Sequence, residues 1–104
     1  MAWLVLIGSG MLEAVWALAL AASKGFTRPL PVAVFVVALV LSMVGLGYAV
    51  RTIPVGTAYA VWVGIGATGT ALAGMVLLRE PVTVARVACL LLIITGVVGL
   101  RYLE

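Results

Sequence analysis

Four long apolar runs account for most of the chain, and short clusters of turn-forming and charged residues separate them. The runs cover residues 2–22, 31–50, 57–78 and 84–103. Each contains about 20 residues, the length at which an α-helix crosses a hydrocarbon core about 30 Å thick. The pattern predicts an all-α integral membrane protein with four transmembrane helices, arranged as a single domain over residues 1–104.

The segments between the runs contain the residues expected at helix boundaries. They read SKGFTRPLP, RTIPVG and REPVT, and their prolines are Pro29, Pro31, Pro54 and Pro81. A proline near a helix start is tolerated because its missing N–H group would have no partner there. Connections this short predict that helices adjacent in sequence run antiparallel. The first run has no basic residue ahead of it and is too long for a signal-peptide core, so we expect no cleavage there.

Composition narrows the function classes further. Of the 104 residues 66% are hydrophobic and 9% charged, and the mean hydropathy is +1.40, which excludes a water-soluble domain of this size. The chain has no histidine and one cysteine, so we expect no metal site, no disulfide and no cofactor. Its six basic residues are scattered one or two per loop, a pattern that suits lipid headgroups and not a nucleic acid.

Basic residues in short loops usually set the orientation of a membrane protein. One face of the predicted bundle has four of them and the opposite face has two. The first group is Lys24, Arg28, Arg79 and Arg86, and the second is Arg51 and Arg101. Taken literally, this difference places both termini outside. So small a bias also allows the same chain to insert in both orientations, and this alternative stays open on the count alone.

One carboxylate interrupts the first apolar run, in the stretch GMLEAVWAL at residues 10–18. Glu13 is the twelfth of 21 residues in that run, which places it close to the bilayer midplane. An acidic side chain there costs about 2.5–3.5 kcal/mol on insertion scales. A protonated glutamic acid that only hydrogen-bonds two helices is one interpretation. The other is a binding site at which a proton and an organic cation exclude each other, the minimum requirement for antiport.

Other side chains of the apolar runs could surround Glu13. Gly10 and Trp16 lie three residues to either side of it on one helical face, and Tyr59 and Trp62 share a face of the third run. Tyrosine hydroxyl and indole N–H groups can donate to a carboxylate, and aromatic rings can face a cation. The alternative is that these rings form interfacial belts or fill packing gaps.

Small and hydroxyl-bearing residues in the second, third and fourth runs are further candidates for a role in the site or in assembly. Ser42 either orients Glu13 or bonds the carbonyl four residues back in its own helix. Gly64 and Gly66 either permit close helix packing or supply a hinge for alternating access. Cys89 and Gly96 form a small-residue seam on the fourth run, which predicts a homodimer of eight helices with two Glu13 carboxylates in one chamber.

At this point the chain resembles the small multidrug resistance family of proton-coupled exporters over essentially its whole length. The resemblance rests on the glutamate of the first helix, the GFTR loop, the block IPVGTAYAVWVGIGA at residues 53–67 and the REP turn. It implies an antiparallel, dual-topology homodimer in the bacterial inner membrane. It also implies that both central carboxylates are shared between protons and substrate, and that the protein is not an enzyme.

Within the family, Trp16 and Ser42 resemble the subtype that exports guanidinium. The resemblance implies that Glu13 binds substrate and proton, and that Trp62 and Ser42 donate hydrogen bonds that position it. It assigns Tyr59 to the switch of access, and Trp16 with Gly10 to the pocket wall. Relatives often carry a lysine at the end of the first helix where this chain has Ala21, so no role of that lysine transfers.

Two rival classes share this sequence pattern. The first is a multidrug exporter of quaternary ammonium or aromatic cations with the same fold. The second is a passive ion channel or a packing subunit, because small dual-topology proteins with four helices can also conduct ions. Glu13 distinguishes an exporter from a channel, since a channel needs no obligatory exchange of a proton.

Overall fold

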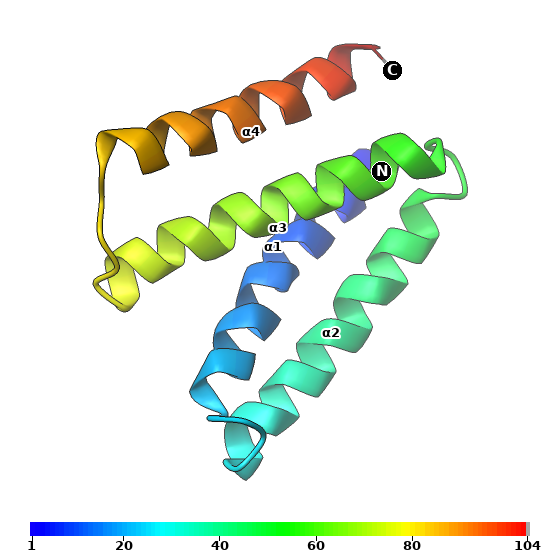
Figure 1. The fold of residues 1–104 in the computed structure, drawn as a ribbon. Coiled ribbons are helices and arrows are strands. Elements are labelled where there is room, and N and C mark those ends of the chain that lie inside the picture. The colour runs from blue at the N-terminus through cyan, green and yellow to red at the C-terminus, as the bar shows by residue number, and fades with distance from the viewer. Residues whose placement is uncertain (104) are drawn as a thin grey trace.

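The computed structural model describes residues 1–103 and consists of four α-helices with short connections (Figure 1). The helices are α1 (Ala2–Ala22), α2 (Pro29–Ala49), α3 (Val55–Leu77) and α4 (Val84–Leu103). All four are long and apolar enough to cross a membrane. The predicted class, an all-α membrane protein with four transmembrane helices, is therefore confirmed, whereas the eight-helix dimer stays a prediction.

Two of the helices begin slightly earlier than the apolar runs. α2 begins at Pro29, where residue 31 was expected, and α3 begins at Val55, where residue 57 was expected. Arg28 precedes the first proline in an extended conformation, with φ −104° and ψ 117°. A residue before proline is pushed out of the helical region, while the proline itself starts a helix without loss because it needs no N–H acceptor there.

The helices are not packed equally. α1 contacts both α2 and α3, whereas α4 contacts only α3 and lies apart from the other two (Figure 1). A compact group of buried side chains joins the N-terminal half of α1 to the end of α2, the α2–α3 connection and the first half of α3: Leu6, Ala49, Ile53, Ala58, Val61 and Trp62. In α4, Leu90 alone is buried. One chain therefore leaves a long apolar face uncovered, which needs lipid or another protein surface against it.

Candidate functional site

Glu13 points from α1 toward α3 and fits into a notch that α3 provides. A β-carbon built at Gly66 would overlap the carboxyl group of Glu13, so only glycine leaves room for the acid at this position. Gly66 is itself buried. Glu13 and Gly66, which are fifty-three residues apart in the sequence, thus lie in direct contact in the structure.

The carboxyl group of Glu13 has unused hydrogen-bonding capacity. Its Oε1 atom is buried and has no hydrogen-bond partner within residues 1–103. The one ion pair of the described chain joins Arg86 to Glu80, so no basic side chain neutralises Glu13 there. An unsatisfied buried acceptor is costly, and in native proteins such an atom calls for a proton, a water or a ligand.

A cavity of about 410 Å³ opens beside Glu13 between α1 and α3. It extends to the α3–α4 connection, where Glu80 lines its other end. The walls between the two acids are mostly small and apolar: Ala17, Leu18, Ala21, Ala67, Thr70, Ala71, Gly74 and Leu78. A water takes up about 30 Å³ in the liquid, so the cavity has room for a small organic cation with some of its hydration.

The Ser42 hydroxyl bonds neither the Glu13 carboxyl group nor the carbonyl four residues back in its own helix. Its hydroxyl donates to the carbonyl oxygen of Ser9 at 2.7 Å and accepts the indole N–H of Trp62 at 3.0 Å. Ser9 lies on α1 one turn before Glu13, and its own hydroxyl donates to the carbonyl of Val5 at 2.8 Å. The bonds therefore connect α1, α2 and α3 in a buried network beside Glu13, and neither Ser42 nor Trp62 donates to Glu13 in this structure.

Close backbone approach accompanies this network. A β-carbon at Gly10 would lie 2.9 Å from the Cβ of Ile65 and 3.3 Å from the carbonyl oxygen of Trp62. A β-carbon at Gly45 would overlap the hydroxyl of Ser9. The structure places Gly10 where α1 presses against α3, and its expected place in the pocket wall stays a prediction.

The two remaining aromatic candidates lie away from the cavity beside Glu13. Trp16 packs edge-on against Phe35 of α2, with ring centroids 5.9 Å apart, and its buried indole N–H has no partner within residues 1–103. Tyr59 stacks at a tilt on Trp62, with centroids 5.8 Å apart, and 56% of it is exposed. A single chain thus leaves Tyr59 on the surface, and its predicted role in switching access stays a prediction.

Comparison with known proteins identifies the family. Residues 1–93 match the family described as Small Multidrug Resistance protein. The chain belongs to the small multidrug resistance family. The resemblance noted in the sequence is thereby confirmed, and the four spans make the chain a multi-pass protein of the bacterial inner membrane.

Several members of the small multidrug resistance family are similar to the chain along nearly all of their length. A protein named guanidinium exporter from Yersinia pseudotuberculosis is 48% identical over 101 residues, covering 97% of each chain. Proteins of the same name from Salmonella typhimurium and Escherichia coli K12 are also 48% identical over 101 residues, covering 97% of this chain and 96% of their own. These relatives are transporters by name, and none is named as an enzyme.

Gly64, one of the two hinge candidates, lies at the contact of α3 with α4. The two residues predicted for self-association lie on α4 itself. A β-carbon at Gly64 would lie 2.5 Å from Val97, so this glycine admits α4 to α3. α3 is one continuous helix through Gly64 and Gly66, and the hinge stays a prediction. Cys89 is exposed, and a β-carbon at Gly96 would meet no atom within 4 Å. A single chain therefore leaves both residues uncovered, and the dimer seam stays a prediction.

Sequence reasoning did not select two residues that the structure brings into the site. Ser9 is a polar residue in an apolar run, within the segment GSG at 8–10, and that signal could have marked it. Glu80 lies in a loop, where a charged residue is ordinary, so nothing in the sequence connected it to Glu13. Within residues 1–103 no group of three potential metal ligands occurs.

Proposed function

We propose that this member of the small multidrug resistance family exports guanidinium and small substituted guanidinium ions, and that protons entering in exchange drive the export. The observation that carries the proposal is the buried Glu13 oxygen with no partner and no neighbouring cation within residues 1–103. The relatives named guanidinium exporter, 48% identical over 101 residues, support the choice of substrate.

The chemistry of the site suits this substrate. Guanidinium is planar and carries several N–H donors, and a carboxylate accepts two of them in a fork, as it does from arginine. Glu13 supplies the carboxylate, Gly66 leaves room for that carboxyl group, and the cavity of about 410 Å³ beside it supplies room for the ion. The surroundings have a low dielectric constant, so an uncompensated charge is disfavoured and either a proton or the cation occupies the acid.

Exclusive occupancy becomes transport when the site faces each side of the membrane in turn. A proton that binds from outside displaces the cation there, and a cation that binds from inside displaces the proton. The proton gradient then drives guanidinium outward. Ser42 and Trp62 hold α1 against its neighbours beside Glu13, and we infer that they position the acid through the helix and not by direct contact.

We further propose that the functional unit is an antiparallel homodimer in which two Glu13 side chains share a chamber. The exposed face of α4, with Cys89 and Gly96 on it, supports this assembly because a second copy can approach it closely. Two acids in one chamber would titrate as a pair, with apparent pKa values that belong to neither side chain alone.

The test is guanidinium-driven proton movement in liposomes that contain the purified protein. We expect a guanidinium gradient to drive protons in the opposite direction, and we expect Glu13→Gln to stop the exchange while the protein still folds, because an amide is cheaper to bury than a carboxylate. A variant that exchanges as well as the original would overturn the role of Glu13. A current only with tetra-alkyl or aromatic ammonium ions would overturn the substrate, and guanidinium flux without proton movement would indicate a channel.

A further inference from the structure

The cavity beside Glu13 has a second acid at its other end. Glu80 lies beyond the C-terminal end of α3 and lines the same cavity as Glu13. Because α3 spans the membrane, this end of the cavity lies toward the headgroups, where a cation from water would arrive first. Small apolar side chains line the path between the two carboxylates and offer the ion no other charge.

The end of α3 places the Glu80 carboxylate over the helix. The carbonyl oxygen of Gly74 accepts the N–H groups of Leu78 at 3.0 Å and of Glu80 at 3.2 Å, and Arg79 between them has a positive φ of 55°. The chain thereby turns back on α3. A β-carbon at Gly74 would overlap the carboxyl group of Glu80, so this acid, like Glu13, lies against a glycine of α3.

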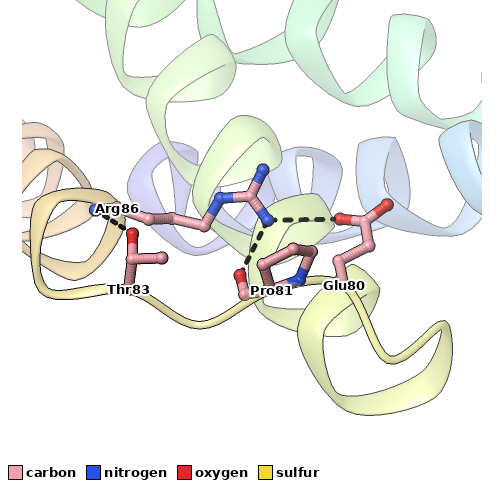
Figure 2. A network of polar contacts seen from close by, with 4 residues as sticks. All are labelled: Glu80, Pro81, Thr83 and Arg86. Atoms are coloured by element: carbon pink, nitrogen blue, oxygen red, sulfur yellow. Dashed lines mark hydrogen bonds and ion pairs between the residues drawn. The ribbon is translucent and has the colours of Figure 1, made fainter.

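A guanidinium group already lies at this acid, and it belongs to Arg86 (Figure 2). Its Nη1 atom donates to the carbonyl oxygen of Pro81 at 3.0 Å and lies 3.7 Å from Oε1 of Glu80. The backbone N–H of Arg86 donates to the hydroxyl of Thr83 at 3.1 Å, which anchors the residue in the first turn of α4. A carbonyl that accepts a hydrogen bond and a nearby carboxylate thus face one guanidinium group, and both are groups that can accept N–H donors from a free guanidinium ion.

The contact between Arg86 and Glu80 is open to exchange. The two side chains are 42% and 45% exposed, and their separation of 3.7 Å is too long for a hydrogen bond. Ion pairs in such surroundings contribute little stability, so a competing cation displaces one member at small cost. Arg86 therefore contacts Glu80 but can be displaced from it.

We propose that Glu80 and the carbonyl oxygen of Pro81 form a second guanidinium-binding site at the mouth of the Glu13 cavity, and that Arg86 occupies this site until a substrate cation replaces it. The proposal rests on guanidinium export as the proposed function. Glu80 raises the concentration of the cation at the mouth, as a negative charge in a partly enclosed cleft does. Arg86 competes for the same acceptors, so it sets how readily the mouth is occupied.

Opposite effects of two substitutions test this proposal. We expect Glu80→Gln to raise the KM for guanidinium about two- to fivefold, and Arg86→Gln to lower it about twofold, with the maximal rate of exchange retained in both. If the pair only holds the α3–α4 connection together, both substitutions break the same contact and shift KM in the same direction. The measurement is the initial rate of guanidinium exchange in liposomes against guanidinium concentration.

Arg79→Gln is the matched control, because it removes the same charge from the same connection and Arg79 forms no ion pair within residues 1–103. The difference between Arg86→Gln and this control should shrink at high salt, since the Debye length falls from about 10 Å at 0.1 M to about 3 Å at 1 M ionic strength. Shifts of KM in one direction, or no shift, overturn the second site. If the unaltered protein exchanges no guanidinium, the proposed function itself fails, and the two failures are thereby distinguished.

Discussion

Glu13 and Glu80 are the same side chain in two different settings, and both carboxyl groups lie against a glycine of α3, Gly66 and Gly74 respectively. Glu13 stands on a helix, with a buried oxygen that has no partner within residues 1–103. Glu80 stands in a connection, half exposed and paired with Arg86. These surroundings support the two proposed roles: an acid with a buried, unpartnered oxygen would bind one cation or proton strongly, whereas the exposed acid would exchange its partner freely.

The contacts that hold the two acids in place also differ. The network of Ser9, Ser42 and Trp62 joins three helices beside Glu13. Glu80 is positioned by the backbone of one helix end and by a side chain that water reaches. Three helices are bonded together at the inner acid and one exposed helix end holds the outer acid, which supports the proposal that the outer site captures the cation and the inner site exchanges it for a proton.

The largest expected effect comes from filling the notch of the inner acid. Gly66→Ala places a methyl group where the Glu13 carboxyl lies, so we expect exchange to fall at least about tenfold and the protein to lose roughly 1–3 kcal/mol of stability from overpacking. Gly8→Ala is the control, because a β-carbon at Gly8 meets nothing within 4 Å. Exchange rates in liposomes and thermal unfolding in detergent measure the two effects, and equal behaviour of both variants would contradict the notch.

The two acids should also differ in how they make the KM for guanidinium depend on pH. If protons compete with guanidinium for Glu13, as proposed, lowering the pH on the substrate side should raise the apparent KM by up to about tenfold per pH unit, and raising the pH should lower it. Glu80→Gln should keep this slope, since the outer site only concentrates the cation. Uptake rates measured over a pH series provide the check. A KM that does not change with pH would remove proton competition from the mechanism.

Loss of the scaffold should have an intermediate effect. Ser42→Ala removes two hydrogen bonds and leaves the indole N–H of Trp62 buried without an acceptor, which costs about 1–2 kcal/mol. The matched control is Thr95→Ala, because Thr95 donates only to the Leu91 carbonyl of its own exposed helix. Thermal unfolding in detergent should show a clear loss for the first variant only. Equal losses would mean that the network adds nothing to the packing of the three helices.

The smallest effect is expected at the outer glycine. Gly74→Ala displaces the Glu80 carboxyl group, but an exposed side chain can turn away, so the KM for guanidinium should rise only about twofold. Gly56→Ala on the same helix is the control, since a β-carbon there meets nothing within 4 Å. A loss as large as that of Gly66→Ala would erase the distinction between the inner and outer acids.

Much of the fold follows from local features of the sequence. Span length and hydrophobicity identified all four helices, and proline and turn residues marked their ends within about two positions. Glu13 was also recognisable without a structure, because a charge in a membrane span is costly and therefore conspicuous. The contacts of the other candidates were not recognisable: Trp62 donates to Ser42, and Ser42 donates to Ser9. Trp16 packs on Phe35.

By itself, therefore, the sequence determined that the chain crosses the membrane four times, that it resembles the small multidrug resistance family and that one acid lies in hydrocarbon. Only the tertiary structure decided which glycine receives that acid, that Glu80 shares its cavity and that Arg86 pairs with Glu80. The physical reason is that hydrophobicity acts along each helix separately, whereas contacts depend on the rotation of one helix against another. In helices that are apolar on every side, no periodic pattern reveals that rotation.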